Sequence, residues 1–358
     1  MRIAFDVSPL SHPLLGIGNY IQGSLGGLAE VATEHGHEVV AFAPTSIRGP
    51  ERIREALAGV DVELRTWRLP FSHAARTAWS SAGRPPAERL LGTFDVLHFS
   101  DWMYPPQREG VRATTIHDLV PIHHPEWTTA RTRSMHGRKY RNAAETCDVV
   151  FVNSAYTGRD VNATLGVPAE RIRVAHPAPK AVYASRGPAA DLGAPYVLTV
   201  ATLEPRKNLQ VLVDAHRLLG GDLQLAVVGA EGWGEQPLLD GAGIRRLGYV
   251  SDEELARLYR GADVVAYPSR FEGFGIPVVE AMACGVPVVV SAHESLDEAA
   301  GSAALRADPE DPASFAAAIE RARAERNDLV ARGLEHVRGF SWRSVGEIFL
   351  RGYEDAAR

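Results

Sequence analysis

The sequence has little cysteine, with only Cys147 and Cys284 among its 358 residues. Cys147 lies at the start of an expected strand and Cys284 in an expected helix, and both have apolar neighbours. Two isolated thiols provide neither a disulfide framework nor the ligand spacing of a zinc site. We therefore predict two buried free thiols and a cytoplasmic, reducing location.

The sequence also lacks a basic excess and a long apolar run. Lysine and arginine number 38 against 44 aspartates and glutamates, a net charge of -6. This balance argues against a nucleic-acid partner, because proteins that bind nucleic acids generally have a basic excess. The chain opens on an apolar strand pattern over 2–7 instead of a secretory signal, and no apolar run approaches a membrane span.

One local basic run, over 131–141, departs from this acidic balance. It could form a helix face that binds the inner surface of an anionic membrane or a lipid-phosphate acceptor. The alternative is a solvated helix face, which is the commoner role of such runs and the interpretation that we favour. The run consists of Arg131, Arg133, Arg138, Lys139 and Arg141.

Several motifs of common enzymes are missing. There is no Asp-x-Asp triplet and no ligand spacing of cysteine or histidine, so we predict no metal site. There is no Gly-x-x-x-x-Gly-Lys-Ser/Thr loop and no Gly-x-Ser-x-Gly elbow. Kinases or ATPases of the first type and hydrolases of the second are therefore disfavoured.

Short apolar runs alternate with helical patterns in two series along the chain. The length suits two domains, and the alternation predicts an open parallel α/β sheet in each. We expect an N-terminal domain over 1–178, a proline-rich linker over 179–195 and a C-terminal domain over 196–342. The fold class is thus α/β, with two facing Rossmann-like domains and an active site in the cleft between them.

Within the first series, a strand over 2–7 leads through a loop at 8–18 into a helix over 19–35. Gly16-Ile-Gly18 matches half of a dinucleotide fingerprint, and a tight turn is the simpler interpretation. Residues 44–93, rich in arginine, proline and alanine, are harder to interpret, and the stretch 67–79 shows no clear period.

Polar residues close three later strands of this series, expected over 94–100, 113–118 and 148–154. In open α/β sheets, ligands bind beyond the carboxyl ends of the strands. The candidates at these ends are His98, Ser100, Asp101, His117, Asp118, Asn153 and Ser154.

Aromatic residues between 102 and 127 offer a surface on which a carbohydrate acceptor could stack, although they could equally belong to the core. They are Trp102, Tyr104 and Trp127, accompanied by His123 and His124.

The most informative stretch, over 269–291, reads as loop, short helix and strand. Pro277 suits the first helical position, where no backbone donor is needed, and Gly285 suits the helix end. Glu272 then lies on the loop and Glu280 in the helix.

The start of this helix would present free amides, from Gly275, Ile276 and Val278, which favour a phosphate together with the helix dipole. Carboxylates on either side could hold hydroxyl groups. A sugar and a ribose joined by a diphosphate would fit, so we predict a nucleotide-sugar site.

A basic pair, Arg206-Lys207, follows the expected strand at 196–200 and precedes a helix. Alone it would be interpreted as a surface pair. Beside Glu272 and Glu280 in the same domain, it is better explained as a diphosphate-binding pair.

These segments together resemble glycosyltransferase family 4, a retaining family of the GT-B fold. The segment Phe271-Glu-Gly-Phe-Gly-Ile-Pro-Val-Val-Glu280 resembles the family signature, and Glu204-Pro-Arg-Lys-Asn208 resembles its phosphate-binding element. Gly248-Tyr-Val-Ser251, His117-Asp118 and Phe340-Ser-Trp342 are similar to further family motifs. The match is strong over 196–345 and looser over 1–180.

The resemblance implies roles in donor binding for several residues. Glu280 would hold the ribose, Glu272 the donor sugar, and Arg206 with Lys207 the diphosphate. The remaining donor-binding candidates are Gly275 and Ile276, through their amides, with Gly18 and Val250.

The resemblance also implies catalytic roles. His117, with Asp118 beside it, would contact the transferred sugar from the opposite domain, and the last helix, over 343–358, would complete the N-terminal domain. Attack would occur on the front face of the sugar, and the leaving phosphate would take the acceptor proton without a metal. Many members have an arginine where this chain has Ala201 and Thr202, so diphosphate binding would depend more on Arg206 and Lys207.

We therefore predict a retaining, metal-independent glycosyltransferase that moves a hexose to a glycan, a lipid-linked sugar or a small molecule, as in polysaccharide biosynthesis. GDP-mannose is the preferred donor, and UDP- and dTDP-sugars remain open. The alternatives are a sugar-phosphate or trehalose-type synthase, which would differ only in its acceptor, and a non-catalytic two-domain sugar-binding protein. Peripheral membrane association and the oligomeric state are also left open.

Overall fold

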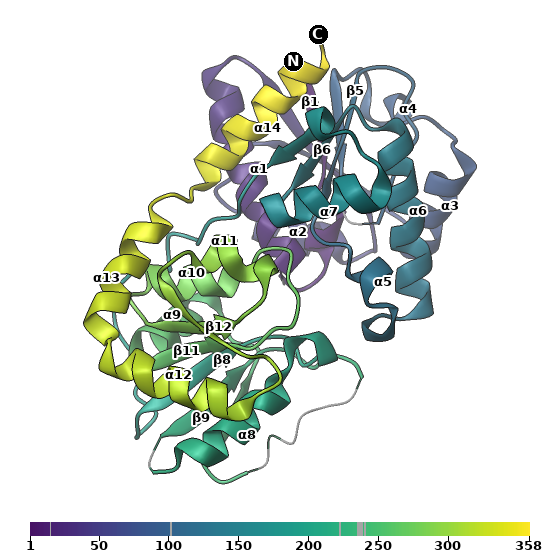
Figure 1. Cartoon of the computed structure of the whole chain (residues 1–358). Helices are drawn as coiled ribbons and strands as arrows, with labels where there is room; N and C mark the ends of the chain where they lie inside the picture. Colours follow the sequence, from purple (N-terminus) through teal and green to yellow (C-terminus); the bar gives the residue numbers. More distant parts are fainter. Residues whose placement is uncertain (15, 101, 222, 235–238, 240) are drawn as a thin grey trace. The chain divides into compact units, whose positions relative to one another are not determined.

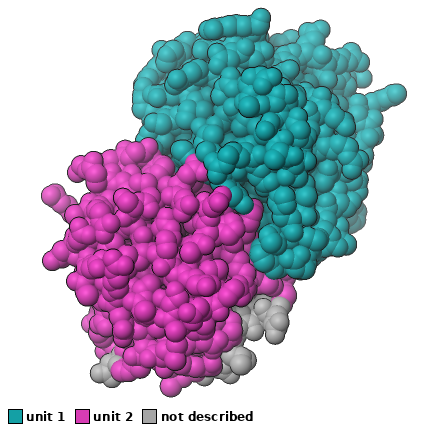
Figure 2. Space-filling model, in the orientation of Figure 1, with its two compact units in different colours: residues 1–177, 341–358 teal, residues 178–340 magenta. Residues whose placement is uncertain are grey.

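The computed structural model describes residues 1–358 except for 15, 101, 222, 235–238 and 240. The chain forms two compact units, shown in different colours in Figure 2. Unit 1 comprises Met1–Pro177 and Ser341–Arg358, and unit 2 comprises Ala178–Phe340. The segment 179–195, which the sequence predicts to be a linker, is part of unit 2, where Tyr183 is buried in the core.

Unit 1 is built on a parallel sheet, which has seven strands among the described residues, in the order β3-β2-β1-β4-β5-β6-β7. Its inner strands are buried on both faces, which explains why they read as continuous apolar runs. The strands are β1 Arg2–Asp6, β2 Glu38–Thr45, β3 Glu63–Arg68, β4 Val96–Phe99, β5 Val111–Ile116, β6 Val149–Val152 and β7 Ile172–Val174.

Unit 2 has a second parallel sheet, with six described strands in the order β10-β9-β8-β11-β12-β13. The strands are β8 Tyr196–Val200, β9 Gln224–Val228, β10 Ile244–Gly248, β11 Val264–Tyr267, β12 Val288–Ser291 and β13 Ala304–Ala307. In both units, every neighbouring pair of described strands is parallel. The predicted α/β class with two parallel sheets is confirmed.

Helices connect the strands of each sheet (Figure 1). Those of unit 1 are α1 Gly16–Glu34, α2 Gly49–Ala56, α3 Ser72–Ala82, α4 Glu88–Leu91, α5 Val120–His123, α6 Ala130–Thr146, α7 Ala155–Leu165 and α14 Trp342–Ala356. Those of unit 2 are α8 Leu209–Leu219, α9 Asp252–Gly261, α10 Ile276–Ala283, α11 Asp297–Ala300, α12 Pro312–Ala324 and α13 Arg326–Val337. None of the helices in the described part of the chain is long and apolar enough to cross a membrane.

The region 44–93 has more structure than its sequence indicates. It contains β3 and the helices α2, α3 and α4. Strand β3 is at the sheet edge and none of its residues is buried, so no apolar run marks it. The turn expected at Gly16–Gly18 is also wrong, because α1 already begins at Gly16 and Gly18 lies in its first turn.

The last helix, α14, packs against α1 of the same unit through glycines, and the two helices lie side by side in Figure 1. A Cβ atom at Gly27 would overlap the backbone carbonyl of Trp342, and one at Gly346 would overlap the carbonyl of Gly27. At the same crossing, Arg343 forms ion pairs with Glu30 and Glu34 at 2.7 and 2.6 Å. The chain thus returns to unit 1 through a crossing too close for side chains at these glycines.

Two adjacent glycines of α1 provide a test of this close approach. Gly27→Ala should lower the free energy of unfolding by about 1–3 kcal/mol through overpacking. Gly26→Ala is the matched control, because its new Cβ would have its nearest neighbour 3.9 Å away. Removing a glycine from a helix interior should there raise stability by about 0.5–1 kcal/mol. Equal denaturant midpoints for the two variants would refute the packing argument.

Candidate active site

The predicted loop and helix after β11 are present in unit 2. Gly275 caps α10 with φ +103°, a conformation that favours glycine, and Pro277 follows in the first turn, where its missing N–H leaves no bond unmade. At the other end, Gly285 has φ +74° and its N–H donates to the Met282 carbonyl at 3.0 Å. The N–H of Val286 donates to the Ala281 carbonyl at 3.2 Å, which completes a Schellman motif.

This geometry places Glu272 on the loop and Glu280 inside the helix, as predicted. It also corrects one expectation about the amides. The N–H of Val278 donates to the Gly275 carbonyl at 3.0 Å and is already used. Gly275 and Ile276 remain as the candidate amides at this helix start.

Glu272 is buried among four side-chain donors. Its Oε1 accepts from Lys207 Nζ at 2.5 Å, from Ser269 Oγ at 2.5 Å and from the Tyr267 hydroxyl at 2.8 Å. Its Oε2 accepts from Arg206 Nη1 at 2.7 Å. Burial alone would raise the pKa of Glu272, but the two cations and these hydrogen bonds outweigh it and lower the pKa to about 2. Glu272 is therefore ionised and held in a fixed orientation.

The two cations come from the short 3-10 turn Pro205–Lys207 that follows β8. Arg206 also donates to Glu204 Oε1 through Nη2 at 2.8 Å and Nε at 3.1 Å. Burial lowers the pKa of Lys207 from its usual value, and Arg206 lowers it further. The cluster thus contains two cations and two carboxylates, so a diphosphate here would meet an electrically balanced group and not a bare basic pair.

Glu280 has a different environment from Glu272. It is buried in α10 and accepts a hydrogen bond from the Tyr259 hydroxyl at 3.3 Å. Burial raises the pKa of Glu280 to about 8, and Asp252 adds to the rise, while Lys180 opposes it. With so little compensation, the carboxyl group of Glu280 is mostly protonated near neutral pH in the free protein.

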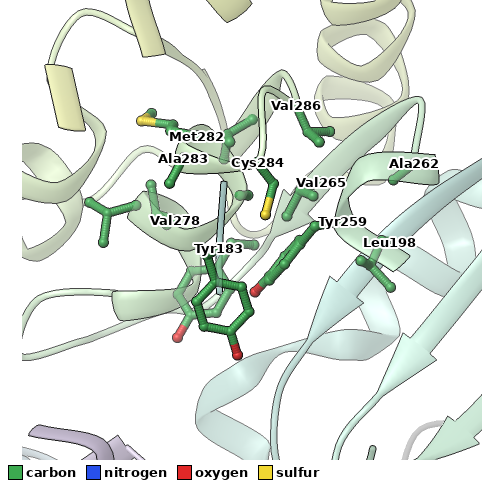
Figure 3. Close-up of a cluster of buried hydrophobic side chains, with 14 of the residues drawn as sticks. Tyr183, Leu198, Tyr259, Ala262, Val265, Val278, Met282, Ala283, Cys284 and Val286 are labelled. Atoms are coloured by element: carbon green, nitrogen blue, oxygen red, sulfur yellow. The ribbon is translucent and has the colours of Figure 1, made fainter. Parts of the chain in front are cut away.

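Four residues near Glu280, namely Lys180, Asp252, Tyr183 and Tyr259, were not predicted as site residues from the sequence. Lys180 Nζ lies 2.8 Å from Asp252 Oδ2, and the Tyr183 hydroxyl donates to Asp252 Oδ1 at 2.8 Å. The Tyr183 and Tyr259 rings meet edge to face at 5.8 Å, and Figure 3 shows them beside Cys284. Prolines around Lys180 and Tyr183 had indicated a linker, so only the fold reveals this cluster.

His117 follows β5 in unit 1, and its ring meets the Tyr20 ring edge to face at 5.0 Å. Its Nε2 atom is buried and has no hydrogen-bond partner among the described residues. Burial lowers the pKa of His117 to about 3, with Lys139 contributing, so the ring is neutral. The carboxylate of its neighbour Asp118 accepts the Val120 N–H at 3.0 Å, a local turn contact.

The predicted acceptor aromatics do not form one exposed surface. Trp102 is buried, with the Arg76 guanidinium 4.8 Å from its ring centroid, which agrees with the alternative that it belongs to the core. Tyr104 packs partly buried against a core cluster, and Trp127 stacks on His124 at 3.8 Å. Of the other candidates, Val250 packs partly buried on the unit 2 core, and Asp101 lies outside the described residues.

The basic run at 131–141 lies on α6 and is not uniformly exposed. Lys139 is buried and donates to the Thr115 carbonyl at 2.5 Å, so it belongs to the interior of unit 1. Arg131, Arg138 and Arg141 are exposed. The prediction of buried free thiols is confirmed for both cysteines.

Two family models match the chain in sequence. The model "Glycosyltransferase Family 4" covers residues 22–178, and "Glycosyl transferases group 1" covers 185–333. The chain is 30% identical to the Escherichia coli protein named O-antigen chain mannosyltransferase B, over 99% of this chain and 100% of that relative.

Solved structures match the whole chain in fold. Sucrose-phosphate synthase from Thermosynechococcus elongatus superposes with a TM-score of 0.73 at 20% identity, over 99% of this chain and 98% of that one. Anabaena HepE, in complex with UDP and glucose, superposes with a TM-score of 0.71 at 15% identity, over 99% and 100%. At these identities the likeness supports the fold alone. The full-length relative and the two family models show that the chain belongs to the glycosyltransferases of family 4, with the GT-B fold.

Proposed function

We propose that the protein transfers mannose from GDP-mannose to a hydroxyl group of a glycan, a lipid-linked sugar or a small molecule, with retention at the anomeric carbon. The observation that carries this proposal is the pair of buried carboxylates on either side of the α10 start. Glu272 and Glu280 differ in partners and in pKa, as expected for groups that bind different parts of a nucleotide sugar.

The preference for mannose rests on the full-length similarity to O-antigen chain mannosyltransferase B. The UDP and glucose bound by Anabaena HepE make a UDP-sugar the second candidate donor. An acceptor within a growing polysaccharide would agree with the name of the first relative. Cytoplasmic supply of nucleotide sugars and the two free buried thiols favour a cytoplasmic location.

The environment of Glu272 supports front-face attack over a covalent intermediate on this residue. Its oxygens already accept from four side chains, and its low pKa makes it a weak nucleophile. In the proposed step, the acceptor oxygen bonds to the anomeric carbon as the bond to the diphosphate breaks. The acceptor proton passes to the departing phosphate oxygen. Arg206, Lys207 and the α10 amides would stabilise the released charge without a metal ion.

A thermal-shift screen of GDP, UDP and dTDP tests the donor. The nucleotide of the natural donor should raise the melting temperature most, since a ligand that binds only the folded state stabilises it by mass action. GDP-mannose with a mannoside acceptor should then release GDP. The strongest shift with UDP would reject GDP-mannose, and no nucleotide release with any donor would reject transfer.

The roles of Glu272 and Lys207 can be separated. Glu272→Gln should reduce transfer by about 10²–10³-fold through lost positioning. It should leave nucleoside diphosphate affinity unchanged or tighter, because Arg206 and Lys207 lose their competing carboxylate. Lys207→Ala should weaken both transfer and affinity.

Glu310→Gln is the matched control for these variants, because it removes a carboxylate from an exposed ion pair with Arg270 in the same unit. Its transfer rate and its nucleoside diphosphate affinity should equal those of the parent, because exposed ion pairs contribute little to stability. Parental transfer by Glu272→Gln would refute its assignment.

Glu280 predicts a pH dependence of donor binding. If the ionised carboxylate accepts two ribose hydroxyls, binding must deprotonate a group whose pKa is about 8 in the free protein. Nucleoside diphosphate affinity should then rise by roughly tenfold from pH 7 to pH 9 and level off above the pKa. The charged and titratable groups that face Glu280 are Asp252, Lys180, Tyr183, Tyr259 and Cys284.

Calorimetry with Glu280→Gln provides the control for this profile, since the nucleotide's own phosphate also ionises. The variant should show the smaller slope of the nucleotide alone. Identical profiles for parent and variant would exclude Glu280 as the source of the dependence.

A further inference from the structure

Two buried polar atoms at neighbouring strand ends of unit 1 lack a hydrogen-bond partner among the residues that the structure describes. His117 Nε2 and Asn153 Oδ1 are buried, and neither has a hydrogen-bond partner in the described part of the chain. Asn153 as a whole is only 8% exposed. Buried polar groups in folded proteins nearly always have a hydrogen-bond partner, so two neighbouring groups without one require an explanation.

The strand register brings these two residues together. Ile116 of β5 and Val152 of β6 are partners across the parallel ladder, and His117 and Asn153 are the next residues along each strand. Side chains alternate between the faces of a strand, so successive residues point to opposite faces. Ile116 and Val152 share one core cluster, which places His117 and Asn153 together on the other face.

No described residue on that face satisfies either atom. The Tyr20 ring contacts the His117 ring, but the Tyr20 hydroxyl donates to the Ala175 carbonyl at 3.0 Å. Ala175 follows β7, the strand next to β6. The pair therefore lies at the carboxyl edge of three adjacent strands, where ligands bind in open parallel sheets.

The chemistry of the two atoms is complementary. Burial keeps His117 neutral by lowering its pKa to about 3, so its Nε2 can carry the single ring proton and donate it. The amide oxygen of Asn153 accepts only. One hydroxyl group can accept from the first atom and donate to the second.

We propose that Asn153 is a substrate-binding residue that, with His117, binds one sugar hydroxyl as both donor and acceptor. This inference rests on the proposed sugar transfer and adds to it a residue in unit 1 that selects for a hydroxyl at one position of the sugar. The hydroxyl belongs to the donor sugar or to the acceptor. An ordered water molecule that only fills the site is the competing explanation, and it makes different predictions.

Asn153→Leu tests the proposal, because it keeps a similar volume and removes the amide. The melting temperature of the free protein should stay the same or rise, since an unpaired buried group is lost. The kcat/KM for transfer from GDP-mannose to a mannoside acceptor, or from the donor found in the nucleotide screen, should fall by about 10–100-fold. A residue that only maintains structure would lose stability without this selective loss of transfer.

Deoxy substrates identify the hydroxyl. The parent and Asn153→Leu are compared with each monodeoxy donor and each monodeoxy acceptor. With the substrate that lacks the bound hydroxyl, the kcat/KM of the parent should fall to that of Asn153→Leu. The Asn153→Leu substitution should then cause no further loss of kcat/KM. If this occurs in the donor series the hydroxyl is on the transferred sugar, and if it occurs in the acceptor series it is on the acceptor.

Thr199→Val is the matched control, because Thr199 Oγ1 is another buried atom without a partner among the described residues, on β8 of unit 2. It should leave kcat/KM unchanged and the melting temperature equal or higher. A lower melting temperature for Asn153→Leu with unchanged kcat/KM would overturn the proposal in favour of a structural water. An inactive parent with every nucleotide sugar would instead overturn the proposed function.

Discussion

The loops that follow β8 and β11 depend on one buried ion cluster, in which Arg206 and Lys207 surround the carboxylate of Glu272. An ionised carboxylate at this depth would be costly without its cations, because burial removes its hydration. The Arg206 carbonyl also accepts the Arg270 N–H at 2.9 Å, so the same residue joins the two loops through its backbone. The same residues therefore neutralise Glu272 and connect the two loops, so a substitution of Arg206 or Lys207 would change the charge around Glu272 and the loop geometry together.

The second carboxylate of the same segment shows what burial does without such compensation. Glu280 lies eight positions further along, yet its pKa is about 8 where that of Glu272 is about 2. Burial raises the pKa at both carboxylates, but at Glu280 the charge of Asp252 adds to the rise, and Lys180, which is paired with Asp252, opposes it only in part. Two glutamates in one short segment are thus prepared for different tasks, one as a fixed anion and one as a group that responds to its ligand.

The sequence predicted those features whose causes are local. Gly275 and Gly285 mark the ends of α10 because their positive φ angles are required by the turn itself. The pairing of Lys180 with Asp252, 72 positions apart, depends on how the chain folds back and left no local signal. The sequence could not decide between surface and core for Trp102, because an aromatic residue after a strand has the same sequence signature whether it is buried or exposed. The two sheets were predictable, since their buried strands are apolar throughout, but the edge strand β3 was not.

The state of a buried polar group distinguishes residues that organise a site from residues left available to a ligand. Glu272 accepts hydrogen bonds from four side chains and has little capacity for a further partner. It therefore orients these neighbours and is poorly placed to give up their hydrogen bonds for those of a ligand. His117 Nε2 and Asn153 Oδ1 are equally protected from water, yet no described residue satisfies them. Folding alone gains nothing from that arrangement, because an apolar pair of the same shape would cost less. The presence of this pair at the carboxyl edge of a parallel sheet is explained if substrate makes the missing hydrogen bonds.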